Sequence, residues 1–139
     1  MAITDKINVL KKNYRRQLAA NKLFEGIEEQ LGSLRESITE VSKVSESNIQ
    51  LDDQGHKELF ITLGGKRGRI SLNLETNEIT AERLEPENNT DITYIIYDEN
   101  QLSVYSKAYP SPQKVKDEKD TTPEAVLDTM LNHLFYDLI

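Results

Sequence analysis

The chain has 139 residues, contains no cysteine, and carries a formal net charge of −7. The length suits a single domain spanning 1–139, and the lack of cysteine excludes disulfides, thiolate catalysis and cysteine-ligated metal centres. Charged residues interrupt the apolar ones near the N-terminus, and no apolar run reaches the ~18 residues of a membrane span. The composition therefore predicts a soluble, cytoplasmic protein without a signal peptide or a membrane contact.

Positive charge is concentrated in two short segments of this acidic chain. Residues 1–23 carry +5 and residues 61–74 carry +3, whereas residues 24–60 and 75–101 carry −6 and −7. Such a chain is not expected to coat nucleic acid non-specifically, but either basic segment could contact a local anion.

Residues 1–43 are predicted to be helical, because their apolar residues recur at steps of three and four. The first set of these residues is Ile3, Ile7, Leu10, Tyr14 and Leu18. A step of six then separates Leu18 from Phe24 and breaks the phase of the pattern. The pattern allows two structures. Either there are two helices with a hinge near residues 20–26, or one long helix projects and pairs with another chain.

Residues 57–107 are predicted to form an antiparallel β-meander of about five strands, because strand-length runs alternate with short turns. A hairpin turn at Gly64 and Gly65 would place Leu59 opposite Ile70 and sort the side chains onto two faces. The expected apolar face of this hairpin contains Leu59, Ile61, Ile70, Leu72 and Leu74. A short additional strand or an irregular passage is expected near residues 41–49.

The C-terminal part is predicted to contain a charged linker, 109–120, and an amphipathic helix, 122–138. Thr122 is a good N-cap and Pro123 suits the first helical turn. The helix has a broad apolar stripe and would not be stable alone in water, so it must pack on the sheet or on a partner chain. The overall prediction is an α+β fold.

The segment "GGKRGR" (64–69) is interpreted as a hairpin tip rather than a phosphate-binding loop. The phosphate-binding pattern requires a Ser or Thr after its lysine and a following helix, and neither is present here. The remaining alternative is that Lys66, Arg67 and Arg69 form a small basic site for a phosphate or an acidic partner.

The second basic segment, "KKNYRR", places cations on a helical face. Lys11 and Arg15 share one side of the helix, as do Lys12 and Arg16, so like charges lie four residues apart and call for counter-charges. The simpler source of these counter-charges is acidic groups of the same fold or of the partner subunit in a dimer. The alternative is that these cations contact a nucleic acid, an anionic lipid or an acidic protein.

No active site is predicted. His56 and His133 are the only histidines, and neither has the converging ligands of a metal centre. The paired carboxylates Asp52 and Asp53 fall in a polar turn, where their pKa values have no reason to shift. We therefore expect no enzyme activity, no cofactor and no metal.

The functional prediction concerns binding surfaces instead. Tyr94, Tyr97 and Tyr105 in the last hairpin, with Leu131 and Phe135 on the terminal helix, are the predicted hydrophobic contacts for a protein partner. The layout, a small acidic helix–sheet–helix chain, is similar in outline to bacterial secretion chaperones, although no motif carries this likeness. We expect a non-catalytic adaptor or chaperone-like homodimer. The alternative is a nucleic-acid-associated protein that contacts phosphates through the two basic segments.

Overall fold

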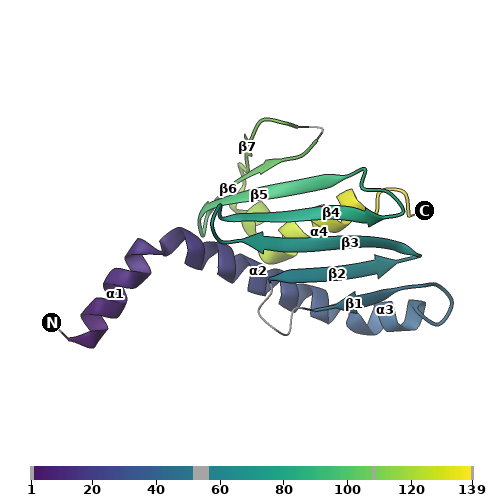
Figure 1. Cartoon of the computed structure of the whole chain (residues 1–139), viewed down its shortest axis with the longest axis horizontal. Coiled ribbons are helices and arrows are strands. Elements are labelled where there is room, and N and C mark those ends of the chain that lie inside the picture. Colours follow the sequence, from purple (N-terminus) through teal and green to yellow (C-terminus); the bar gives the residue numbers. More distant parts are fainter. Residues whose placement is uncertain (1, 52–56, 108, 139) are drawn as a thin grey trace.

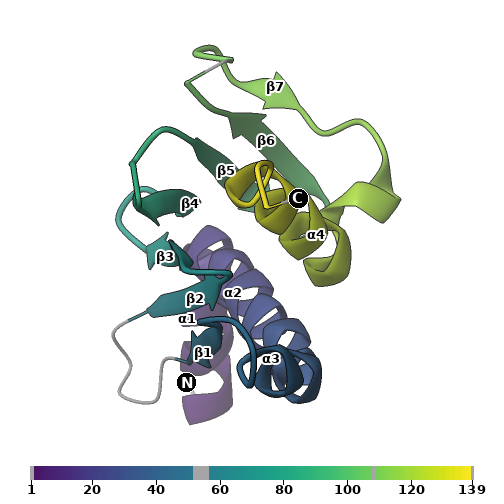
Figure 2. The same cartoon turned by 90° about the vertical axis from the view of Figure 1, so that its right-hand side faces the viewer.

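The computed structural model of the chain describes residues 2–51, 57–107 and 109–138. It has an α+β fold in which one antiparallel sheet is covered by helices on a single face (Figures 1 and 2). The helices are α1 (Ile3–Asn13), α2 (Arg15–Ser33), α3 (Arg35–Val41) and α4 (Pro123–Leu134), and a short 3-10 helix, η1 (Glu118–Thr121), precedes α4. The predicted fold class is confirmed.

The N-terminal helices are divided at Tyr14 and at Leu34, not near residues 20–26 as the first of the two predicted structures required. α2 continues through the break in the apolar pattern. The apolar residues after the break lie on a different face of the helix from Leu18 and form a second stripe, which is buried. That stripe contains Ala19, Ala20, Leu23, Phe24, Ile27 and Leu31. A step of six residues turns a helix by ~600°, so Leu18 and Phe24 point about 120° apart. The phase break therefore marks a change of face rather than a hinge.

The sheet has seven strands in sequence order, and each strand is antiparallel to the next. They are β1 (Asn48–Gln50), β2 (Glu58–Leu63), β3 (Lys66–Asn73), β4 (Glu78–Glu85), β5 (Asp91–Asp98), β6 (Gln101–Tyr105) and β7 (Gln113–Lys114). The five central strands match the predicted meander. The prediction missed β7, which lies inside the predicted linker, because a two-residue edge strand leaves no periodic pattern.

The predicted register of the first hairpin is confirmed. Leu63 pairs with Lys66 and Leu59 with Ile70, and the two turn residues Gly64 and Gly65 have φ angles of 58° and 79°. Such positive angles are open to glycine without steric cost, which is why this pair forms the tight turn. One residue of the predicted apolar face differs, since Leu74 lies in the following turn and is 38% exposed.

The core lies between the apolar face of the sheet and the helices α2 and α4. Helix α4 begins as predicted, with the Thr122 hydroxyl accepting a hydrogen bond from the Ala125 amide at 3.2 Å. Its residues Val126, Met130 and Leu134 are fully buried against the same chain's sheet and α2. The terminal helix therefore packs on its own sheet, which settles the choice that the sequence left open.

Helix α1 behaves differently from the others. It extends away from the body of the molecule (Figure 1), and none of its residues is buried. The second predicted structure, one long helix, is wrong because the segment is divided at Tyr14 and Leu34. Only the projection that it expected is seen, for α1, and nothing in the structure tests whether α1 pairs with another chain.

Candidate functional site

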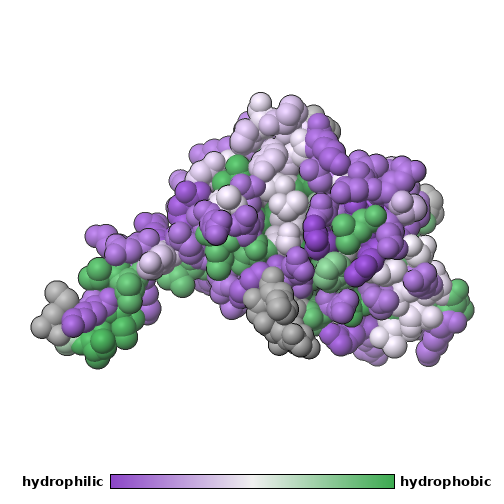
Figure 3. All heavy atoms as spheres, viewed as in Figure 1, coloured by the Kyte–Doolittle hydropathy of each residue, from purple (hydrophilic) through white to green (hydrophobic). Residues whose placement is uncertain are grey.

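The main candidate site is the N-terminal arm, which we define as residues 3–18, that is, α1 and the first turn of α2. Five of its six apolar residues occupy one face of the helix and are between 45% and 69% exposed. They are Ile3, Ile7, Leu10, Tyr14 and Leu18, and we call this set the arm stripe. Figure 3 shows hydrophobic side chains gathered along this projecting helix, apart from the body. Large apolar side chains at helical spacing with nothing covering them are typical of an interaction surface.

Charged residues border the arm stripe. On a helical projection Lys6 lies on one side of the stripe and Lys11 on the other. Among the described residues, the side chains of Lys6, Lys11 and Lys12 have no ion-pair or hydrogen-bond partner. The arm therefore presents an apolar centre with unpaired positive charge at its edges.

The other two cations of "KKNYRR" contact the body of the same chain, and the Arg15 side chain remains 74% exposed. Arg15 lies 3.9 Å from the carboxylate of Asp98, and Arg16 donates a hydrogen bond to the carbonyl oxygen of Ile96 at 3.2 Å. The Arg16 guanidinium also stacks over the ring of Tyr97 at 5.2 Å from its centroid. Acidic and aromatic groups at the β5–β6 turn thus supply part of the counter-charge that the sequence called for.

The predicted hydrophobic contacts are divided between the core and the surface. Tyr94 and Phe135 are buried, at 4% and 8% exposure, and Leu131 is partly buried against the same core. Burial raises the pKa of the Tyr94 hydroxyl. A partner could contact Tyr94 and Phe135 only if α4 detached, whereas Leu131 keeps part of its surface exposed. Tyr97 is exposed and lies under Arg16.

Tyr105 lies on the opposite, open face of the sheet and is half-buried. Its hydroxyl donates a hydrogen bond of 2.6 Å to the Glu78 carboxylate. That bond raises the pKa of Tyr105, with burial adding to the effect. The predicted tyrosine set therefore does not form one continuous patch, because successive strand residues point to opposite faces.

The cations of "GGKRGR" are all engaged inside the chain. Lys66 lies 3.2 Å from the Asp137 carboxylate, Arg67 stacks 4.5 Å from the Phe60 ring centroid, and Arg69 pairs with Glu82. The predicted hairpin tip is confirmed, and its positive charges serve contacts within the fold. None of the three is left free to hold a phosphate in this state.

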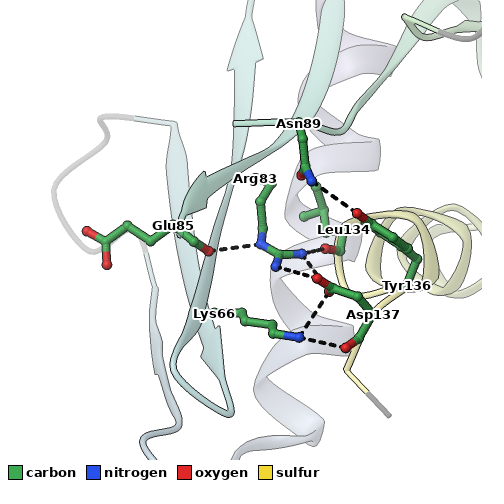
Figure 4. Close-up of polar contacts among 7 residues, drawn as sticks. All are labelled: Lys66, Arg83, Glu85, Asn89, Leu134, Tyr136 and Asp137. Carbon is green, nitrogen blue, oxygen red and sulfur yellow. Dashed lines mark hydrogen bonds and ion pairs between the residues drawn. The ribbon is translucent and has the colours of Figure 1, made fainter. Parts of the chain in front are cut away.

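An ion-pair cluster around the buried Arg83, at the C-terminal end of α4, was missed by sequence reasoning (Figure 4). Arg83 is 1% exposed, and its guanidinium donates to the carbonyl oxygens of Glu85 and Leu134 at 2.9 and 2.6 Å. It also makes two hydrogen bonds to Asp137, which Lys66 contacts as well. The strand alternation Ile79, Ala81, Arg83 would have revealed it, because it places an arginine on the apolar face, where it needs partners.

The residues considered for a metal or an active site are placed only in part. No group of three or more histidine, aspartate or glutamate side chains within it is arranged to hold a metal ion. His56, Asp52 and Asp53, which the sequence analysis considered, lie outside the described residues. None of the helices described here combines the length and apolar character needed to cross a bilayer.

Comparison of the chain with protein-family models, with curated proteins and with solved structures found no match in any of the three.

Proposed function

We propose that the chain is a non-catalytic protein-binding protein, of the adaptor or chaperone type, that associates through its N-terminal arm and forms a homodimer. The observation that supports this proposal is the arm stripe, in which five large apolar side chains share one helical face and are about half exposed or more. We also propose the cytoplasm as its location.

The length of α1 supports the need for a partner. A helix of 11 residues is marginal in water by itself, because its few hydrogen bonds hardly offset the cost of nucleation. Packing normally supplies the missing stability, yet α1 has no buried residue. Covering Ile3, Ile7 and Leu10 would contribute on the order of 1 kcal/mol each, since about half of each side chain is exposed.

Two substitutions on adjacent residues of α1 test the proposal. Leu10 belongs to the arm stripe, whereas Val9 is equally apolar, 50% exposed and on the opposite side of the helix. We expect light scattering to show a dimer for the wild type and for Val9→Asp, and a monomer for Leu10→Asp. A wild type that stays monomeric at every concentration would contradict the homodimer. Association that Leu10→Asp leaves intact would contradict the role of the arm.

The alternative proposal is a nucleic-acid-associated protein that contacts phosphates through the two basic segments. Of the seven cations proposed for it, only Lys11 and Lys12 lack a partner within the described residues. The internal contacts of the other five favour protein binding. This alternative expects binding to an oligonucleotide that weakens steeply with salt and is lost in Lys11→Glu/Lys12→Glu.

A further inference from the structure

A solvent-facing groove lies between the last turns of α2 and the first turns of α4. It has a volume of about 290 Å³, and its apolar lining comes from Leu34, Leu127 and Leu131. Leu34 is 39% exposed although it is a large apolar residue. Leu131 is partly exposed, whereas Leu127 is buried at 4%, so Leu34 and Leu131 are the apolar side chains of the groove that the chain leaves accessible.

The rim of this groove is acidic. Glu124 and Asp128 lie four residues apart on α4, so they share one side of the helix. In the described part of the chain neither carboxylate has a hydrogen-bond or ion-pair partner. An apolar floor with unpaired negative charge on its edge is the complement of the arm, which has an apolar stripe with unpaired lysines on its edges.

The arm of a given molecule cannot reach the groove of the same molecule. α1 ends next to Tyr14, while the residues near the end of α2 that line the groove, Gln30 to Leu34, lie 15 to 19 residues after Arg15, which is ~22–28 Å along the helix axis. α1 has 11 residues and a length of ~16 Å, so even a full reversal at Tyr14 would leave it short of Leu34. An arm that occupies the groove must therefore come from another molecule.

We propose that the α2–α4 groove is the docking site for the arm of a second copy of this chain, so that two copies exchange arms. Subtracting the +5 of residues 1–23 from the net charge of −7 leaves −12 on residues 24–139, so each body attracts the basic arm of the other copy. Each copy gives its arm to the other and receives the other's arm. A single two-fold axis relates the two contacts, so the dimer leaves no arm or groove unoccupied. This inference rests on the proposed function and assigns the surface that the arm binds.

Charge reversal on each side tests the docking site by sedimentation velocity. The arm variant is Lys6→Glu/Lys11→Glu and the groove variant is Glu124→Lys/Asp128→Lys. Each variant alone places like charges together at both contacts, and we expect its dimer dissociation constant to rise roughly tenfold or more. An equimolar mixture pairs the reversed arm with the reversed groove and leaves the second contact as in the wild type. We expect this mixture to form a heterodimer about as tight as the wild-type dimer.

Two control variants each reverse two charges of the same sign at sites outside the arm and the groove. Glu36→Lys/Glu40→Lys on α3 and Lys114→Glu/Lys116→Glu near β7 alter exposed residues outside the groove and the arm. They should leave the dimer unchanged, and circular dichroism checks that every variant is folded.

The outcomes separate this inference from the function on which it rests. If Leu10→Asp abolishes the dimer but the groove variant does not weaken it, the arm binds another surface, such as a second arm. The groove assignment is then overturned while the proposed function stands. If Leu10→Asp also leaves the dimer intact, both fail.

Discussion

Arg83 on β4 and Asp137 after α4 form a bidentate ion pair. The two terminal guanidinium nitrogens of Arg83 lie 3.0 and 3.1 Å from the two carboxylate oxygens of Asp137. Arg83 also donates to the last carbonyl of α4, at Leu134, where positive charge is favourable for the helix dipole. The pair therefore fastens the end of α4 to the middle of the sheet.

We expect Asp137→Asn to lower the melting temperature. The substitution leaves the Arg83 guanidinium buried with only carbonyl partners, and an uncompensated buried charge is strongly unfavourable. Amide hydrogen exchange at Phe135 and Leu138 should also become faster, because the segment loses its attachment to β4. Glu87→Gln, on an exposed carboxylate, is the control and should change neither measurement. An unaltered melting temperature in Asp137→Asn would mean that the pair contributes nothing to stability.

The same ion pair predicts how stability depends on pH. Hydrogen bonds from Arg83 lower the pKa of Asp137 from 3.8 to about 2, with Lys66 assisting. Because the folded-state pKa is the lower one, the contribution of Asp137 is fully present above about 4 and is lost as the pH falls toward 2. The difference in melting temperature between wild type and Asp137→Asn should shrink over this interval. A difference that stays constant down to pH 2 would contradict the assignment.

Two glycines of α2 are expected to respond in opposite ways to the same substitution. A Cβ atom on Gly26 would lie 2.4 Å from Cγ of Pro123, so Gly26→Ala must push α4 away from α2 at a cost of ~1–3 kcal/mol. A Cβ atom on Gly32 would meet only Leu51, at an ordinary 3.9 Å. Gly32→Ala should therefore stabilise the protein by up to ~1 kcal/mol through helix propensity. Urea titrations of the two variants measure both values, and equal effects would contradict the close crossing of α2 and α4.

Phe135 is expected to act as a core residue. Because it is buried at 8% exposure, Phe135→Ala should lower the free energy of unfolding by ~3–5 kcal/mol. The exposed aromatic Tyr109 provides the comparison, and Tyr109→Ala should stay within ~0.5 kcal/mol of the wild type. A Phe135→Ala variant of normal stability would show that α4 is detached in solution and that its apolar face is free for a partner.

The arm is expected to affect association without affecting the stability of the monomer. Ile7 and Leu10 are exposed, so Ile7→Ser/Leu10→Ser should change the unfolding free energy by ~0.5 kcal/mol or less when protein is dilute. At high concentration the wild type should become more stable than this variant, because dimer formation adds to its stability. The absence of any concentration dependence in the wild-type melting temperature would contradict arm-mediated association.

Much of the sheet could be predicted from alternation along the chain. The pairing of Leu59 with Ile70 follows from a two-residue glycine turn and a period of two, and both are local properties. Arg83 was missed although the same alternation contains it, because its partners Leu134 and Asp137 lie more than 50 residues away. The groove could not be predicted either, since the approach of α4 to α2 brings together residues that no local pattern connects.

The amino-acid sequence alone determined the helical N-terminal segment, the five central strands and the terminal helix. It also determined which side of the first hairpin is apolar, and that two apolar stripes follow one another out of phase near Leu18 and Phe24. Only the tertiary structure decided which stripe becomes core. Apolar periodicity shows that one face of an element must be buried. It does not identify the segment that packs on this face, because burial depends on contacts between distant segments. The second stripe is covered by the chain's own sheet and α4, and the first stripe remains exposed on the arm.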